Sequence, residues 1–252
     1  MKKKCQKTRV AAIIPARYAS TRFPGKPLVP ISGVSMIERV YRQASQAQLL
    51  DEVIVATDDQ RIFDAVSGFG GTVVLTRDDH INGTDRLAEV AAARPDLDII
   101  VNVQGDEPLI DPGNIDAAVG PLLDSPDICM STLCAPIKTE EEFLNPNVVK
   151  VVLDKNGFAL YFSRSPIPHD RDRLGFNQIK HWGHLGLYVY RRQTLLSISQ
   201  LPSTPLEEIE KLEQLRALEN GIRIMVVPVA HRSLAVDRPE DVEAVEKALL
   251  AV

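Results

Sequence analysis

The chain has 252 residues and a formal net charge of −5, with 44% hydrophobic and 25% charged residues. This length suits one compact α/β unit with a single core, and the composition excludes both intrinsic disorder and a disulfide scaffold. The acidic balance argues against a nucleic-acid-binding protein, which needs a surplus of lysine and arginine to displace phosphate counterions.

Neither a signal peptide nor a membrane span is predicted. The apolar stretch Val10–Ile14 after the basic start is too short for a signal peptide, and no other segment approaches the length of a membrane span. The three cysteines, Cys5, Cys129 and Cys134, are odd in number and have no zinc-like spacing with histidine. We therefore expect reduced thiols in a cytoplasmic protein.

The first hundred residues alternate between strand and helix patterns. Runs rich in β-branched residues predict buried parallel strands at 10–14, 52–57, 72–75 and 98–103. Helical patterns lie between them at 35–44, 61–66 and 84–93, and Ser35 and Glu38 have the spacing of a capping box. This alternation predicts a doubly wound, mostly parallel sheet with right-handed crossovers.

Strands predominate from residue 128 onward. Runs at 128–136, 148–153, 158–162 and 185–190 predict an inserted antiparallel portion at about 128–200, with a turn at 155–157. A long helix is expected over 206–218, ended by Gly221, and then a strand at 222–227 and a final helix capped by Asp237 and Glu240. No linker interrupts the chain, so residues 1–252 are expected to form one domain with this antiparallel lobe.

The segment after the first strand is basic. Because ligands of open α/β sheets bind beyond the carboxyl ends of the strands, the sequence PARYASTRFPGKP at 15–27 is a candidate phosphate-binding loop. It lacks the glycines of dinucleotide-binding and P-loop motifs, so its three cationic side chains, Arg17, Arg22 and Lys26, would have to supply most of the charge. The alternative is a solvated basic loop.

Carboxylates follow two later strands. Asp106 and Glu107 come after the fourth strand, and Asp106 is well placed for Mg²⁺, which takes one or two protein carboxylates and completes its shell with phosphates and water. Asp237 is the candidate for a second carboxylate, although a helix cap is an equal alternative for it. The polar loop at 76–86 offers amides to a base edge, or forms an ordinary turn and cap.

Nine stretches, in order along the chain, carry a family resemblance. They are IIPARYASTRFPGKPL, VIVATDD, GTDRLAEV, IVNVQGDEPLID, NPNVVKVVLD, ALYFSRSPIP, HLGLY, LEEIEKLEQLRALENG and VDRPED. Together they resemble the 3-deoxy-manno-octulosonate cytidylyltransferases, also called CMP-Kdo synthetases, over essentially the whole chain. A single stretch such as GDEP is weak, whereas the ordered set is specific.

The resemblance implies a Mg²⁺-dependent enzyme that couples CTP to Kdo and releases pyrophosphate, a cytoplasmic homodimer acting in lipopolysaccharide biosynthesis. The nucleotide is expected at Pro15, Ala16, Arg17, Lys26, Arg77, Asn82, Gly83 and Gln104. The sugar acid is expected at Arg22, Arg164, His184, Tyr188, Glu210 and Gln214, with an arginine meeting its carboxylate. Asp106 and Asp237 would hold the metal and, with Arg17 and Lys26, form the catalytic set.

Several residue assignments remain open. Ala235 stands where most relatives are expected to have glycine, and its methyl group would tighten or shift the approach of Asp237. His181 repeats the His-x-Gly pattern of His184, which is preferred because Tyr188 follows it at the spacing of the family. From the residues alone, His184 would be a satisfied, partly buried histidine. Likewise, Glu210 and Gln214 would be a solvated helix face.

The expected chemistry is in-line attack of the anomeric hydroxyl on the α-phosphorus of CTP, without a covalent enzyme intermediate. A nicotinamide dehydrogenase is disfavoured because the glycine fingerprint is absent and Asp58 lies about forty residues beyond the first strand, too far for a ribose carboxylate. A non-catalytic sugar-nucleotide sensor would not need both carboxylates. An enzyme for 8-amino-Kdo or sialic acid would share the nucleotide half.

Overall fold

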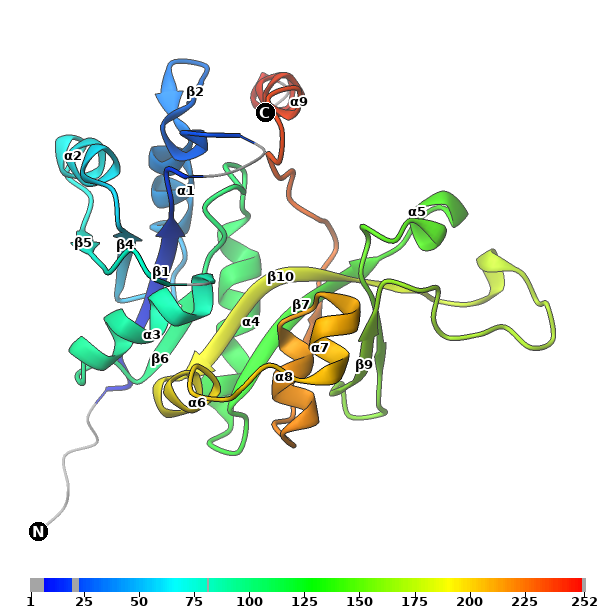
Figure 1. Cartoon of the computed structure of the whole chain (residues 1–252). Coiled ribbons are helices and arrows are strands. Elements are labelled where there is room, and N and C mark those ends of the chain that lie inside the picture. The colour runs from blue at the N-terminus through cyan, green and yellow to red at the C-terminus, as the bar shows by residue number, and fades with distance from the viewer. Residues whose placement is uncertain (1–6, 20–22, 81, 251–252) are drawn as a thin grey trace, which may run out of the picture.

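The computed structural model describes residues 7–19, 23–80 and 82–250, and within them nine strands form one mixed sheet (Figure 1). These strands are β1 Val10–Ala16, β4 Glu52–Thr57, β5 Val73–Leu75, β6 Ile99–Asn102, β7 Met130–Pro136, β8 Lys150–Leu153, β9 Ala159–Ser163, β10 Trp182–Arg191 and β11 Met225–Pro228. Their order is β11-β7-β10-β6-β1-β4-β5, and β8 pairs with β10 and β9. A separate hairpin joins β2 Pro30–Ile31 to β3 Val34–Ser35.

Helices cover both faces of the sheet. They are α1 Met36–Ala44, α2 Gln60–Gly68, α3 Gly83–Ala93, α4 Pro112–Asp124, α5 Glu140–Leu144, α6 Arg192–Ile198, α7 Pro205–Glu210, α8 Gln214–Glu219 and α9 Asp241–Leu249. Because successive strand side chains point to opposite faces, Ala12 and Ile14 pack with α1, α2, α4 and α9, whereas Ala11 and Ile13 pack with α3, α6 and α8. Burial on both faces explains why these strands are continuous apolar runs.

The N-terminal half has the predicted doubly wound arrangement. β1 pairs in parallel with both β4 and β6, and β4 pairs in parallel with β5, with helices as crossovers. The carboxyl ends of these strands therefore meet at one edge of the sheet, where the loops after β1 and β6 lie next to each other. The prediction of a mostly parallel nucleotide-binding-type sheet is confirmed.

The predicted antiparallel strands continue this same sheet. β10 runs antiparallel to β6, β7 and β8, while β7 and β11 are parallel. β10 is longer than the predicted 185–190, and its pairing register with β7 shifts between Leu185 and Tyr188. The predicted turn joins β8 to β9, with Gly157 at a φ of 86° that favours glycine. The β8–β9 pair projects beyond the rest of the sheet (Figure 1).

The long helix predicted over 206–218 is wrong, because the chain breaks into α7 and α8 at Lys211, whose φ is 52°. The guanidinium of Arg164, on the segment after β9, donates to the carbonyl oxygens of Glu210 (2.7 Å) and Lys211 (3.4 Å). A continuous helix would need those carbonyls for its own hydrogen bonds, so this tertiary contact overrides the helical pattern. The predicted end at Gly221 is confirmed, with a φ of 76°.

Two predicted caps are wrong in detail. The last helix begins at Asp241, and the Asp241 carboxylate accepts hydrogen bonds from the backbone of Asp237 and Arg238 at 2.8 Å, so Asp237 does not cap it. Ser35 does precede α1, but its side chain makes no capping bond, and Glu38 pairs with Arg42 instead. The side chain of Asp237 is therefore not committed to a helix terminus.

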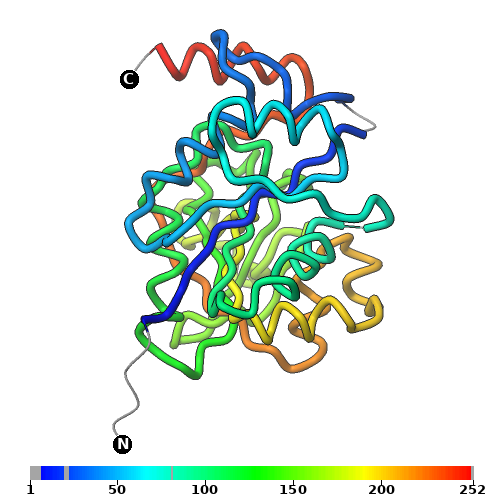
Figure 2. The backbone as a smooth tube through the Cα atoms, turned by 90° about the vertical axis from the view of Figure 1, so that its left-hand side faces the viewer, coloured from blue at the N-terminus to red at the C-terminus, as the bar shows by residue number. Residues whose placement is uncertain are grey.

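The C-terminal segment returns to the start of the chain. α9 lies beside the β2–β3 hairpin in both views (Figures 1 and 2), and the backbone N–H of Ser32 donates to Glu246 at 2.6 Å. Just before α9, the Val236 N–H donates to the Asp106 carbonyl at 2.8 Å. These contacts bring the segment around Asp237 to the loops after β1 and β6. No helix within the described ranges is long and apolar enough to cross a membrane.

Candidate active site

Lys26 lies at the centre of a cluster formed by three distant segments. Its Nζ donates to Asp106 Oδ2 at 2.8 Å and to the Val236 carbonyl at 2.9 Å, and it lies 3.9 Å from Asp237 Oδ1. The two carboxylates predicted as metal ligands thus face the same cation. Gly105 lets the loop after β6 lie close to the end of β1, because a Cβ there would stand 3.0 Å from the Pro15 carbonyl oxygen.

A pocket of about 370 Å³, here called the loop pocket, opens beside this cluster. Its lining is Pro15, Ala16, Arg17, Ala19, Lys26, Pro27, Gly83, Gln104, Gly105 and Asp106. It therefore joins the basic loop after β1, the first residue of α3 and the end of β6. The alternative for the basic segment was a solvated loop. Lys26 does not fit that alternative, because its side chain is only 16% exposed.

Arg17 contacts the start of α3. Its Nη2 donates to the Asn82 carbonyl at 2.8 Å, and burial together with the charge of Arg86 lowers the pKa of Arg17. The Asn82 side chain caps α3 by accepting from the Asp85 N–H at 2.8 Å. A guanidinium and a helix N-terminus thus flank the loop pocket, and both are suited to an anion.

Arg77 does not join this group. Its side chain is 68% exposed and pairs with Asp79 at 3.1 Å. It lines a separate pocket with His80 and Glu89, and none of the described residues that line this pocket also lines the loop pocket. Contact of Arg77 with the nucleotide stays a prediction.

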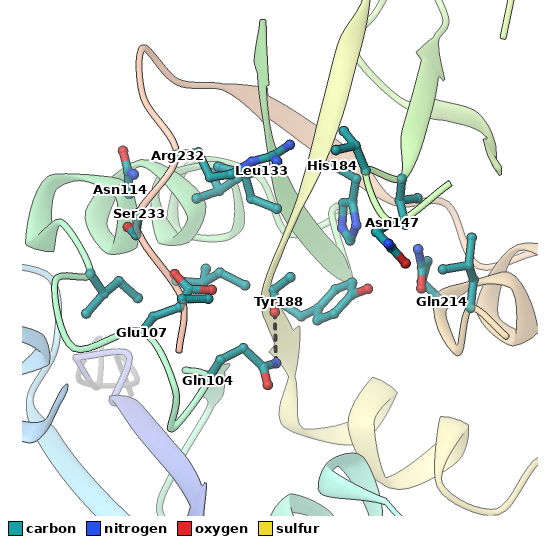
Figure 3. A pocket seen from close by; sticks show the side chains of 18 residues that line it. Gln104, Glu107, Asn114, Leu133, Asn147, His184, Tyr188, Gln214, Arg232 and Ser233 are labelled. Carbon is teal, nitrogen blue, oxygen red and sulfur yellow. Dashed lines mark hydrogen bonds between the residues drawn. The ribbon is translucent and has the colours of Figure 1, made fainter. Parts of the chain in front are cut away.

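A second pocket of about 390 Å³, here called the wide pocket, lies along β10 (Figure 3). Its polar lining side chains are Gln104, Glu107, Asn114, Asn147, His184, Tyr188, Gln214, Arg232 and Ser233, and Ala235 also lines it. Three residues predicted to bind the sugar, His184, Tyr188 and Gln214, are therefore brought together here.

His184, and not His181, faces the wide pocket. The Thr132 hydroxyl donates to the Leu187 carbonyl at 2.7 Å, so His184 Nε2 donates to the same hydroxyl at 2.9 Å and its Nδ1 is left as an acceptor. Burial and the charge of Arg232 lower the pKa of His184 to about 3, so the imidazole is neutral near pH 7. His181 is 4% exposed and packs against the rings of Phe143 and Phe176.

Gln214 is buried, with 5% exposure, which makes the solvated-face alternative wrong for this residue. Its Nε2 has no hydrogen-bond partner in the described part of the chain, although Gln214 lines the wide pocket. A buried amide donor without a partner costs free energy, about 1–3 kcal/mol, unless water or a ligand satisfies it. Gln214 is therefore suited to donate a hydrogen bond to a bound molecule.

Arg164 and Glu210 have structural contacts instead. The Arg164 guanidinium donates to the Glu210 carbonyl at 2.7 Å and to the Pro146 carbonyl at 3.0 Å. The Glu210 carboxylate accepts from the Ser163 hydroxyl at 2.6 Å and the Arg164 N–H at 2.9 Å, so it is not a solvated side chain. Neither lines the wide pocket, and their contact with a sugar stays a prediction. Arg22 lies outside the described residues.

Residues that the sequence reasoning did not assign to the site also line the wide pocket. They are chiefly Glu107, Asn114, Asn147 and Arg232. Burial, with the neighbouring charge of Asp106, raises the pKa of Glu107 to about 7, while the charge of Arg232 opposes this rise. Glu107 and Asn147 lie in the GDEP and NPN stretches, which were a usable signal, whereas no local pattern marks Arg232.

Gln104 connects the two pockets. It lines both of them and a smaller pocket of about 150 Å³ between them, which also contains Pro15, Gly83, Tyr188 and Gln214. Its Nε2 donates to the Gly186 carbonyl at 2.9 Å, the bond drawn in Figure 3, and this holds the end of β6 against β10. The pockets thus form one cleft with a basic end and an end suited to a polar molecule.

The described residues contain no cluster of three or more histidine, cysteine or carboxylate side chains that could hold a metal ion. Asp106 and Asp237 are a two-carboxylate set whose oxygens lie 2.8 and 3.9 Å from the Lys26 ammonium nitrogen. This set fits Mg²⁺, which takes its remaining oxygen ligands from phosphates and water, better than it fits a metal that requires a full protein cage.

Comparison with known proteins identifies close relatives. A family model described as Cytidylyltransferase matches residues 11–224. A 3-deoxy-manno-octulosonate cytidylyltransferase from Syntrophotalea carbinolica is 58% identical over 243 residues, covering 94% of this chain and 97% of the relative. One from Geobacter sulfurreducens is 56% identical over 246 residues, with coverage of 94% and 97%. A solved CMP:2-keto-3-deoxy-manno-octonic acid synthetase complexed with CTP has a TM-score of 0.91 at 44% identity, covering 97% of this chain and 99% of its own.

Proposed function

The chain belongs to the cytidylyltransferase family, and on this premise we propose that it transfers the CMP group of CTP to 3-deoxy-manno-octulosonate (Kdo). The observation that carries the proposal is the cleft with two ends joined at Gln104. The loop pocket offers Arg17 and Lys26 to phosphates, and the wide pocket offers His184, Tyr188 and Gln214 to a sugar. Family membership excludes the nicotinamide dehydrogenase alternative.

The reaction needs positioning and charge stabilisation more than covalent chemistry by the protein. The anomeric oxygen of Kdo forms a bond to the α-phosphorus while the bond from that phosphorus to the pyrophosphate oxygen breaks, and the hydroxyl proton passes to solvent. Gln104 lies where the two substrates would meet, since it lines both ends of the cleft. Nδ1 of the neutral His184 would accept a hydrogen bond from a sugar hydroxyl.

Asp106 and Asp237 would hold Mg²⁺, because both already face one cation, the Lys26 ammonium group. When bound, the metal supplies positive charge that stabilises the phosphates and the leaving pyrophosphate. Lys26, which lines the loop pocket, would hold the triphosphate together with Arg17. The backbone hydrogen bond from Val236 to Asp106 ties the segment that carries Asp237 to the loop that carries Asp106.

The proposal extends to a cytoplasmic homodimer acting in lipopolysaccharide biosynthesis. Support for a reducing compartment comes from Cys129 and Cys134, which are both free thiols, whereas Cys5 lies outside the described residues. Support for a dimer comes from exposed apolar side chains at the β8–β9 end of the sheet, including Leu160 at 63% and Ile209 at 79% exposure.

The direct test is pyrophosphate release from CTP in the presence of Mg²⁺, with Kdo, 8-amino-Kdo and N-acetylneuraminate as acceptors and with ATP and UTP in place of CTP. We expect rapid release only with CTP and Kdo. Faster release with another acid would change the acceptor and leave the reaction class intact. Absence of release with every acceptor would favour a non-catalytic sugar-nucleotide sensor.

A further inference from the structure

Arg232 is placed to meet an anion in the wide pocket. It belongs to the extended segment between β11 and α9, and Figure 3 shows its side chain reaching across the rim of the pocket toward β10. Among the described residues that line this pocket, Arg232 is the one lysine or arginine. The basic residues of the loop pocket, Arg17 and Lys26, lie at the other end of the cleft.

The Arg232 guanidinium lies close to β10 at Gly183, where the lack of a side chain leaves room for it. A Cβ at Gly183 would stand 2.7 Å from Arg232 Nη2, closer than non-bonded atoms normally approach. Within the described part of the chain, Arg232 makes no hydrogen bond or ion pair, and its charge acts at longer range on the Glu107 carboxylate of the same pocket. Its planar set of donors is therefore available to a ligand, and a carboxylate matches that geometry with two parallel hydrogen bonds.

Of the two arginines expected at the sugar acid, Arg22 lies outside the described residues and Arg164 is engaged elsewhere. The Arg164 guanidinium donates to three backbone carbonyls, those of Pro146, Glu210 and Lys211. Binding a carboxylate there would require those contacts to break, and the interruption between α7 and α8 would lose its support. Arg232 can bind a carboxylate without any such loss.

We infer that Arg232 binds the carboxylate of the acceptor and makes the wide pocket selective for sugar acids over neutral sugars. This assignment rests on the proposed function, because it concerns the acceptor end of the same cleft. It makes Arg232 a specificity residue for the acceptor and gives it no part in binding CTP.

The test compares wild type with Arg232→Met and Arg232→Lys, using pyrophosphate release with Kdo and with its primary amide, a neutral analogue of the same shape. Arg232→Met should raise KM for Kdo about 10- to 100-fold, since a charge-assisted, two-point contact is lost, and should leave KM for CTP within about twofold. The preference for acid over amide should largely disappear. For Arg232→Lys, KM for Kdo and the preference for acid over amide should lie between those of wild type and Arg232→Met. An ammonium group keeps the positive charge but lacks the two parallel N–H donors of a guanidinium.

Gly183→Ala provides a second, independent variant, because it keeps the charge and displaces the guanidinium. It should raise KM for Kdo several-fold and leave KM for CTP unchanged. Arg42→Gln is the matched control. It removes an exposed arginine whose partner is Glu38 on α1, so its kinetics should equal wild type.

Two results would overturn the inference. One is an Arg232→Met enzyme that retains the wild-type preference for acid over amide. The other is a rise in KM for CTP in place of KM for Kdo, which would assign Arg232 to the nucleotide. Failure of the proposed function is distinguishable from both, because wild type would then release no pyrophosphate with CTP and Kdo.

Discussion

At the scale of single residues, the cluster around Lys26 makes the sharpest prediction. Asp106→Asn removes the carboxylate that binds Lys26 at 2.8 Å and that would carry Mg²⁺. We expect kcat to fall at least about 100-fold, because stabilisation of charge on the phosphates is a main contribution to this chemistry. The measurement is pyrophosphate release across a Mg²⁺ titration.

Asp124→Asn, at an exposed position at the end of α4, is the control for the Asp106 variant. Its kcat should match that of wild type at every Mg²⁺ concentration. If Asp106→Asn keeps wild-type turnover at low Mg²⁺, the assignment of Asp106 as a metal ligand is wrong.

His184 predicts a dependence of stability on pH. Burial holds its pKa at about 3 in the folded protein, against about 6.5 in an unfolded chain. As the pH falls below the unfolded value, the unfolded state takes up a proton that the folded state does not. The free energy of unfolding therefore falls with decreasing pH, by at most about 1.4 kcal/mol per pH unit from this group.

His184→Gln removes that contribution, so its free energy of unfolding should decline less steeply than that of wild type between about pH 6.5 and 5. Urea unfolding at three pH values measures the two slopes. His231→Gln, at an exposed position, should keep the wild-type slope. Equal slopes for wild type and His184→Gln would contradict a lowered pKa of His184 in the folded protein.

Residues that follow a strand could be predicted from the sequence, because the end of a parallel strand fixes where the next side chains lie. Asp106 and Gln104 are examples, and His184 and Gln214, which the family resemblance assigns to the sugar, line one pocket. Arg232 could not be predicted in this way. Its position depends on the route of an extended segment and on Gly183 of β10, which is about fifty residues away in the chain.

At the scale of elements, Lys150 stabilises one wall of the wide pocket. Its side chain is fully buried, and its Nζ donates to the carbonyls of Asn145 (3.0 Å), Val148 (2.7 Å) and Arg164 (2.5 Å). It thereby ties the loop before β8, which carries Asn147, to the end of β9. A fully buried ammonium group is tolerated only with such partners.

Lys150→Met keeps the approximate shape and removes three hydrogen bonds. We expect the free energy of unfolding to fall by about 2–3 kcal/mol, because buried carbonyls lose their partners. KM for Kdo should rise more than KM for CTP, since only the wall of the wide pocket is disturbed. Urea unfolding and the pyrophosphate assay measure these effects.

Lys247→Met on α9 is the matched control, because its side chain is 72% exposed and forms an exposed ion pair with Glu243. Its stability should change by no more than about 0.5 kcal/mol. A Lys150→Met protein as stable as this control would show that the buried ammonium group does not hold the loop.

Strands were predictable where both faces are buried, since apolar β-branched runs then carry the signal without alternation. The interruption between α7 and α8 was not predictable, because the apolar spacing of 206–218 is that of one helix. The Arg164 guanidinium, on the segment after β9, binds the carbonyl oxygens of Glu210 and Lys211 that such a helix would use. α4 was not predicted either, although Asp111 followed by Pro112 is a usable start signal for a helix.

At the scale of the whole molecule, the cleft is assembled by elements far apart in the chain. β1, β6 and β10 lie next to one another in the sheet, so their loops contribute to both ends of the cleft. The alternating order of strands and helices in the sequence predicted the parallel part. It did not predict that β10 inserts between β6 and β7, which is what places His184 and Tyr188 opposite Gln104.

The proposed homodimer makes the last prediction. Leu144, Leu160, Leu174 and Ile209 are 59–79% exposed, and they come from α5, β9, the segment after β9 and α7, at one end of the sheet (Figure 1). If this end is the dimer interface, Leu160→Lys with Ile209→Lys should bury two charges without partners and dissociate the dimer. Sedimentation velocity at micromolar concentration should then give 27.8 kDa for this variant and twice that mass for wild type.

Leu75→Lys is the control, because Leu75 is 53% exposed on β5, at the opposite edge of the sheet, and this protein should remain dimeric. A wild-type monomer would contradict the dimer, and a dimeric double variant would move the interface elsewhere. The pyrophosphate assay on the double variant shows whether loss of the dimer also removes catalytic activity. Both ends of the cleft are lined by residues of a single chain, so the monomeric variant should keep measurable turnover of CTP and Kdo.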